Sequence, residues 1–98
     1  MKVYDKASWH IDGGEKKADV IARFREVFEF LQEKKMLNAE GIETLEYAMD
    51  SSVSLNSKML NTEGKDFIDC YYEEVIEHNP KKIRKNLLVA YKKFMDED

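Results

Sequence analysis

The chain has few residues that cross-link a fold or interrupt helices and strands, with one cysteine, one proline and four glycines among 98 residues. A single cysteine excludes an intramolecular disulfide and is typical of a reducing compartment. So little proline and glycine excludes collagen-like and low-complexity chains. No run of about 18 apolar residues occurs, and none follows the N-terminus, so we expect neither a membrane-spanning helix nor a signal peptide. A cytoplasmic protein is the resulting expectation.

Motifs that carry known chemistry are also missing. Gly13 and Gly14 stand without the spacing or the Lys-Ser pair of a phosphate-binding loop. There is no Cys-x-x-Cys, no His-Glu-x-x-His, no calcium-binding loop and no nucleophile elbow. The motifs therefore predict no catalytic residue, no metal ligand and no cofactor, and they favour a non-enzymatic role.

Charge is what the chain has in excess. Charged residues make up 37% of it, against about 25% in an average domain. The net charge of −4 is unevenly distributed: residues 36–79 hold ten acids and two bases, whereas residues 80–98 hold six bases and three acids. The sequence thus predicts an acidic middle followed by a basic final helix.

Helical periodicity predicts an all-α fold, a small bundle of four main helices in one domain. The first should span residues 15–35, with Asp12 as N-cap and Glu15 completing a capping box. A second helix should run from 39 to about 50 and a third from 62 to about 78. Asn79 and Pro80 should open the last helix.

Two segments leave alternatives open. Residues 1–14 are expected to form either a short helix, capped by Asp5 and stopped by Gly13 and Gly14, or an extended arm. Residues 51–61 should form a short extended piece or one helical turn, and they should pack down because eleven residues are long for a connection.

A short phrase occurs twice, as Met-Leu-Asn-Ala-Glu-Gly at 36–41 and Met-Leu-Asn-Thr-Glu-Gly at 59–64. Asn38 and Asn61 are predicted to be the N-caps of the second and third helices. Glycine at the third helical position costs stability relative to alanine. Its presence in both copies, at Gly41 and Gly64, predicts close packing of the backbone there.

Acidic side chains form rows along two predicted helices: Glu43, Glu46 and Asp50 on the second, and Asp66, Asp69, Glu73 and Glu77 on the third. Like charges at helical spacing destabilise a helix by about 0.2–0.5 kcal/mol per pair. Two arrangements would relieve this repulsion. Either Lys81, Lys85 and Lys92 of the basic helix pair with Glu73 and Glu77 inside the fold, or the acidic face stays open and attracts a basic protein.

The second arrangement gives the main hypothesis, a protein-protein interaction module that presents an acidic face to a basic partner. Its predicted partner-binding residues are Glu43, Glu46, Asp50, Asp66, Asp69 and Glu73, with Tyr72 and Trp9 as aromatic anchors. Trp9 also suits a core position, and Tyr72 the edge of the core. The chain is similar in size, charge and helical content to immunity proteins, small acidic helical proteins that neutralise bacterial nuclease toxins. This likeness covers no motif and transfers no residue.

Other hypotheses use other residues. A small ligand- or metal-binding protein or enzyme would need a pocket that brings together His10, Asp12, Tyr72 and His78. A structural homo-oligomer would use an uncovered apolar face. The basic helix also suggests nucleic acid, which the net negative charge disfavours. Cys70 is predicted to be a semi-buried, unreactive thiol.

Overall fold

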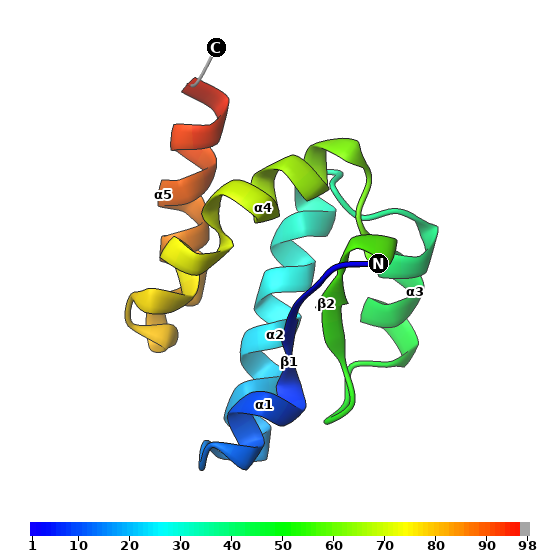
Figure 1. The fold of residues 1–98 in the computed structure, drawn as a ribbon, viewed down its shortest axis with the longest axis vertical. Helices are drawn as coiled ribbons and strands as arrows, with labels where there is room; N and C mark the ends of the chain where they lie inside the picture. The colour runs from blue at the N-terminus through cyan, green and yellow to red at the C-terminus, as the bar shows by residue number, and fades with distance from the viewer. Residues whose placement is uncertain (97–98) are drawn as a thin grey trace.

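Helices make up most of the structure, a computed structural model that describes residues 1–96 (Figure 1). The helices are α1 (Ala7–Asp12), α2 (Lys17–Glu33), α3 (Ala39–Tyr47), α4 (Thr62–Glu77) and α5 (Ile83–Asp96). Strands β1 (Val3–Lys6) and β2 (Ser54–Asn56) form a small sheet, and 3-10 turns Ser57–Met59 and Pro80–Lys82 precede α4 and α5. The predicted helical fold with four main helices is confirmed. No helix in this part of the chain is long and apolar enough to cross a membrane.

The helices share one connected apolar core. Helix α5 packs against both α4 and α2, while α1 and α3 pack against α2. Figure 1 shows α5 and α3 at opposite edges of the molecule, with α2 between them. The ring of Phe67 lies within 6.4 Å of the rings of Phe30, Tyr71, Tyr91 and Phe94. Aromatic pairs at such distances stabilise by about 0.5–1.5 kcal/mol each beyond their burial, so this cluster anchors α4 and α5 on α2.

The first long helix begins two residues after its predicted start. Its N-cap is Lys16, whose side chain makes no capping hydrogen bond, and the helix proper begins at Lys17. Asp12 instead ends α1, and the carboxylate of Glu15 bonds to side chains of α1 and α2. The predicted capping box is therefore wrong, because Glu15 is held elsewhere and a glycine turn separates Asp12 from α2.

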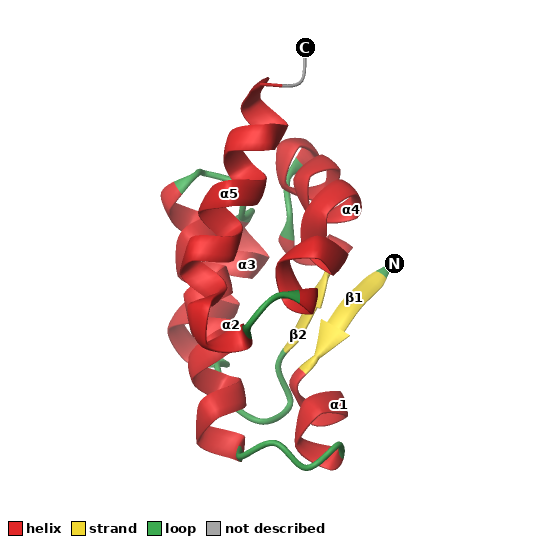
Figure 2. Cartoon of the chain, turned by 90° about the vertical axis from the view of Figure 1, so that its left-hand side faces the viewer, coloured by secondary structure: helices red, strands yellow, loops and turns green. Residues whose placement is uncertain are grey.

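Residues 1–12 combine both predicted alternatives, a strand followed by a short helix. Strand β1 pairs antiparallel with β2, with a bulge near Val3, and Figure 2 shows this sheet on one side of the molecule, beside α1. The register pairs are Val3–Asn56, Asp5–Leu55 and Lys6–Ser54. Asp5 is not the predicted cap, since Lys6 occupies the N-cap position and the Asp5 side chain points into the protein. The helix does stop at the glycines: Gly13 is its C-cap, and Gly14 has a φ of 104° that suits glycine.

The two copies of the repeated phrase lie against each other. Leu37 and Leu60 form an antiparallel bridge. The backbone amides of Asn38 and Asn61 each donate to the methionine carbonyl of the other copy, at 3.0 Å in both directions. We call residues 36–41 and 59–64 the repeat junction. It holds the start of α3 beside the start of α4.

Each asparagine of the repeat junction uses both ends of its amide. The side-chain oxygens of Asn38 and Asn61 accept from the amides of Gly41 and Gly64, at 3.0 and 2.9 Å, which confirms both predicted N-caps. Their Nδ2 atoms donate across the junction. The distances are 2.7 Å from Asn38 to Lys58 O and 2.6 Å from Asn61 to Lys35 O.

The two glycines sit where a side chain has no room. A Cβ atom on Gly64 would lie 2.5 Å from the carbonyl oxygen of Met36, and one on Gly41 would meet that of Met59 as closely. Real Cβ atoms do not come this near a backbone oxygen, and both carbonyls are fixed by the junction's hydrogen bonds. The prediction of close backbone packing at both copies is confirmed.

The segment between α3 and α4 packs down, as its length predicted. It contains both predicted forms, β2 and then a 3-10 turn. Four of its apolar side chains are buried: Val53, Leu55, Met59 and Leu60. Its first residues are less regular, because α3 ends at Tyr47 rather than near residue 50.

The remaining predictions concern the last two helices. Asn79 accepts a hydrogen bond from the amide of Lys81 at 3.0 Å, so the predicted cap is confirmed, although a 3-10 turn intervenes before α5. Cys70 is exposed on α4, and the prediction of a semi-buried thiol is wrong. Its apolar neighbours in sequence turn inward, while Cys70 faces outward.

Candidate functional site

The acids predicted on the second helix divide into two groups. Glu43 and Glu46 lie on α3 and are exposed. Asp50 lies beyond the end of α3, in a turn where Oδ1 accepts from the amide of Ser52 at 2.8 Å and from its hydroxyl at 2.5 Å. These bonds, the hydroxyl first, hold the pKa of Asp50 below its usual value. Asp50 therefore shapes a turn, and its predicted place in the row on α3 is wrong.

The acids predicted on α4 are all exposed. Asp66 and Glu73 are two of them. Asp69 is exposed too, but unlike Asp66 and Glu73 it forms an ion pair among the described residues: the Lys2 ammonium lies 3.0 Å from its carboxylate. Lys2 and the Tyr4 hydroxyl together hold the pKa of Asp69 below its usual value. Burial, followed by the Asp69 carboxylate, raises the pKa of Tyr4 to about 12.

The basic helix α5 pairs with acids outside these rows. Lys93 Nζ lies 3.1 Å from the carboxylate of Glu74 on α4. Arg84 bridges Glu26 and Glu33 on α2. Within residues 1–96, no ion pair joins Lys81, Lys85 or Lys92 to Glu73 or Glu77, so the internal pairing predicted for these residues is wrong. The cause is geometric: Ile83, Leu87 and Ala90 turn inward, and this sets Arg84 towards α2 and Lys93 towards α4.

The two predicted aromatic anchors lie in opposite environments. Tyr72 is only 6% exposed, and its hydroxyl donates to Asp5 Oδ2 at 2.6 Å. Burial and the nearby Asp5 charge raise its pKa well above the ordinary tyrosine value. Trp9 is 54% exposed, with the Lys6 ammonium 5.7 Å from its ring, so the core position considered for it is wrong.

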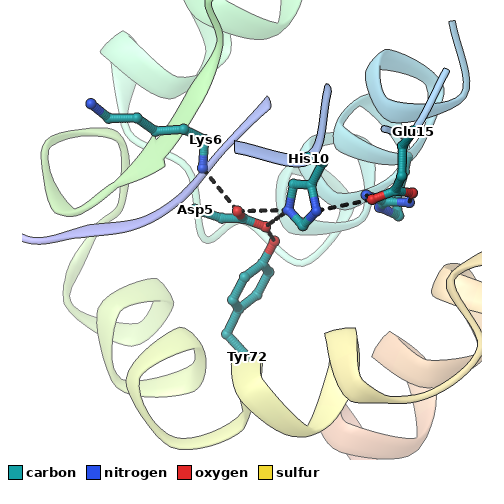
Figure 3. A network of polar contacts seen from close by, with 6 residues as sticks. Asp5, Lys6, His10, Glu15 and Tyr72 are labelled. Carbon is teal, nitrogen blue, oxygen red and sulfur yellow. Dashed lines mark hydrogen bonds and ion pairs between the residues drawn. The ribbon is translucent and has the colours of Figure 1, made fainter. Parts of the chain in front are cut away.

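A connected set of charged and polar side chains ties the N-terminal segment to α2 and α4 (Figure 3). We call this set the N-terminal clasp; its members are Asp5, His10, Glu15, Arg23 and Tyr72. His10 Nε2 lies 2.8 and 2.9 Å from the two oxygens of Asp5, and Nδ1 lies 3.1 Å from Glu15. Arg23 donates two hydrogen bonds to the carboxylate of Glu15, at 2.8 and 3.1 Å. The clasp thereby joins β1, α1, the loop before α2, α2 and α4.

The geometry of the clasp determines what His10 can do. Both ring nitrogens face a carboxylate, and an ionised carboxylate only accepts hydrogen bonds. Both nitrogens must therefore carry a proton for both contacts to be hydrogen bonds. Arg23, followed by other contacts that include His10, holds the pKa of Glu15 below its usual value, so Glu15 stays ionised. Because a carboxylate lies at hydrogen-bond distance from each ring nitrogen, His10 bridges Asp5 and Glu15 and presents neither nitrogen to a substrate.

Two adjoining surface hollows border the clasp. The smaller, about 100 Å³, is lined by His10, Glu15, Arg23, Ile76 and Pro80. The larger, about 360 Å³, shares three of these residues and extends along α2 to the start of α5. Its lining mixes acids, bases and apolar side chains without a converging set of one charge.

The pocket predicted from His10, Asp12, Tyr72 and His78 is not assembled as a unit. His10 and Tyr72 do meet, through Asp5. Asp12 is exposed at the end of α1, and His78 lines a separate hollow between α4 and α5. No group of three or more possible metal ligands comes together in the part of the chain that the structure describes. Sequence reasoning missed Asp5, Glu15 and Arg23, and no spacing or motif links them.

Comparison of the chain with protein-family models, with curated protein sequences and with solved structures finds no match.

Proposed function

We propose that this chain is a non-enzymatic interaction module whose acidic surface binds a basic partner protein. We define the acidic surface as six of the exposed carboxylates of α3 and α4, namely Glu40, Glu43, Glu46, Asp66, Asp69 and Glu73. The repeat junction sets the starts of these two helices side by side. Such a concentration of one charge accelerates encounter with an oppositely charged protein, most strongly at low salt.

The observation that carries the proposal is the failure of the internal alternative. Arg84 and Lys93 of helix α5 form ion pairs with acids outside the acidic surface. Of the six carboxylates of that surface, Asp69 alone has an ion pair among the described residues, with Lys2. No ion pair within residues 1–96 relieves the mutual repulsion of Glu40, Glu43 and Glu46 on α3, and a basic partner would relieve it.

Tyr47 is the better aromatic anchor for this surface. Tyr72 is buried, whereas Tyr47 on α3 is 82% exposed. A hollow of about 320 Å³ lies beside it, lined also by Glu40, Glu43 and Thr44. Carboxylates next to an aromatic face suit a lysine or arginine side chain, through charge and through cation–π contact. Trp9, exposed on α1, stays a predicted contact at a separate place.

The test compares two variants with equal change in charge. In the first, Glu43→Gln, Glu46→Gln, Asp66→Asn and Glu73→Gln neutralise the acidic surface. In the control, Asp12→Asn, Asp19→Asn, Glu29→Gln and Asp96→Asn neutralise four exposed acids elsewhere. The two variants and the unaltered chain are immobilised separately and exposed to a lysate of the source organism at about 0.01 M and about 1 M salt. The proteins that each one captures are then identified.

The proposal predicts a basic protein held by the unaltered chain and the control at low salt, and lost from the first variant. A synthetic lysine-rich peptide, measured by calorimetry, should show the same order of affinities. Equal binding of the peptide to both variants would contradict the proposal, provided that circular dichroism shows both to be folded.

A further inference from the structure

Helix α5 has a second face that the fold leaves uncovered. Its inner side buries Ile83, Leu87 and Ala90. The outer side, which we call the basic face, carries Lys85, Leu88, Val89, Lys92 and Met95, all of them exposed. Leu88, Val89 and Met95 are 42%, 47% and 51% exposed, and they make up half of the large apolar side chains exposed in the described part of the chain.

The cations of the basic face are not neutralised by the fold. Arg84 and Lys93 of α5 have acidic partners, but Lys85 and Lys92 form no ion pair with another described residue. Two lysines one heptad apart, with apolar side chains between them, form a row about 10.5 Å long on one side of a helix. An apolar patch rimmed by charge is typical of an interaction site.

The acidic surface offers a complementary row on α3. Glu40, Glu43 and Tyr47 follow one another at helical spacing, and Glu40 and Tyr47 are also one heptad apart. The two rows carry opposite charge, and each includes an exposed apolar or aromatic side chain. Figure 1 places α3 and α5 at opposite edges of the molecule, so one chain cannot bring its own two rows together.

We infer that the basic face docks on the α3 part of the acidic surface of a second copy of this chain. The inference rests on the proposed function, because it names a partner for the same acidic surface. Leu88 and Val89 would pack on Tyr47, and either Lys85 or Lys92, according to the relative direction of the two helices, would face Glu43. The contact uses different patches on the two copies, so it is head-to-tail and extends into rings or filaments.

The first experiment measures mass by light scattering over a range of protein concentrations. At about 0.01 M salt the Debye length is about 30 Å, and at about 1 M it is about 3 Å. The expected result is concentration-dependent assembly at low salt and its loss at high salt. A chain that stays monomeric at low salt, up to the highest soluble concentration, overturns the inference.

Charge exchange identifies the two faces. A basic-face variant, Lys85→Glu with Lys92→Glu, should be monomeric because both of its rows are acidic. An acidic-surface variant, Glu40→Lys with Glu43→Lys, should be monomeric because both of its rows are basic. A one-to-one mixture of the two should assemble again. The control variant, Lys16→Glu with Lys17→Glu, changes two exposed lysines elsewhere and should assemble like the unaltered chain.

The outcomes separate this inference from the proposed function. Assembly of either exchanged variant alone, or no assembly of the mixture, overturns docking between these two faces. If a lysine-rich peptide still binds the unaltered chain but not the acidic-surface variant, the proposed function stands with another protein as the partner. The Lys16/Lys17 control is four charge units more negative than the unaltered chain, so peptide binding that rises in it as strongly as it falls in the acidic-surface variant would show that net charge, and not the acidic surface, governs binding.

Discussion

The repeat junction and the N-terminal clasp both join segments that are distant in the sequence, but they use different physical interactions. The junction relies on backbone hydrogen bonds, two asparagine amides and two glycines in close contact. The clasp relies on polar and charged side chains, two of which contact the buried carboxylate of Asp5. The junction should therefore be sensitive to shape, and the clasp to charge and pH.

The two regions also differ in how they could be found. Residues of the junction serve their own helix as well as the other copy, since Asn38 caps α3 and also donates across the junction. Because each asparagine caps its own helix, the junction could be recognised in the sequence as a helix start that occurs twice. Members of the clasp come from five places in the chain, and most of their side-chain hydrogen bonds are to each other.

The largest effect is expected from breaking the clasp at its centre. In Asp5→Ala, the Tyr72 hydroxyl and the His10 ring lose their buried carboxylate partner, and Glu15 remains as the one hydrogen-bond partner of His10. Leaving a buried polar group without its hydrogen-bond partner costs about 1–3 kcal/mol, and two side chains lose a partner here. The free energy of unfolding, measured with urea, should fall by about 3 kcal/mol. Asp5→Asn keeps an acceptor and should lose less; a loss below about 1 kcal/mol in Asp5→Ala would show that the clasp contributes little.

A smaller but still large effect is expected from shape at the junction. In Gly64→Ala the new methyl group meets Met36 O, which the amide of Asn61 already holds. Overpacking of this kind costs about 1–3 kcal/mol, although alanine favours helix more than glycine does. Urea unfolding should show a net loss of about 2 kcal/mol. Thr62→Ala, an exposed change in the same turn, should stay within about 0.5 kcal/mol; a stabilised Gly64→Ala would contradict the close approach.

The fold could be predicted wherever a sequence pattern is consistent with a single kind of secondary structure. The helical class, both asparagine caps and the glycine contacts followed from periodicity and from the repeat. The predicted capping box of Asp12 and Glu15 is wrong because the same two residue types suit either a helix cap or long-range hydrogen bonds. In the structure Glu15 bonds to His10 and Arg23. Nothing local distinguishes a carboxylate that caps a helix from one that reaches across to a histidine.

The candidate site was predictable in composition but not in pairing. Exposure of Glu43, Glu46, Asp66 and Glu73 follows from their helical spacing. Which base meets which acid depends on how α5 is rotated against α2 and α4, and this is set by the packing of its inner apolar side chains. The same rotation leaves Lys85 and Lys92 on the outside.

The pH dependence of the clasp should be visible through Tyr72. Its pKa is raised in the folded protein, so its contribution is complete below the unfolded value of about 10 and is lost as pH rises towards the folded value. Tyr72→Phe removes a hydrogen bond to a charged acceptor, worth about 1.5 kcal/mol. The stability difference between the two proteins should be constant from pH 7 to about 10 and shrink above it. A difference that grows above pH 10 would contradict the raised pKa.

The smallest effect separates the two roles of the junction asparagines. Asn38→Asp keeps the oxygen that caps α3 but loses the Nδ2 donor to Lys58 O. Asn79→Asp is its matched control, because Asn79 caps the turn before α5 and its side chain has no second bond among the described residues. Both changes place a negative charge at a helix start, where it is favourable. Asn38→Asp should therefore be about 1 kcal/mol less stable than Asn79→Asp in urea unfolding. Equal stabilities would mean that Asn38 acts as a cap alone and that backbone bonds and shape hold the junction.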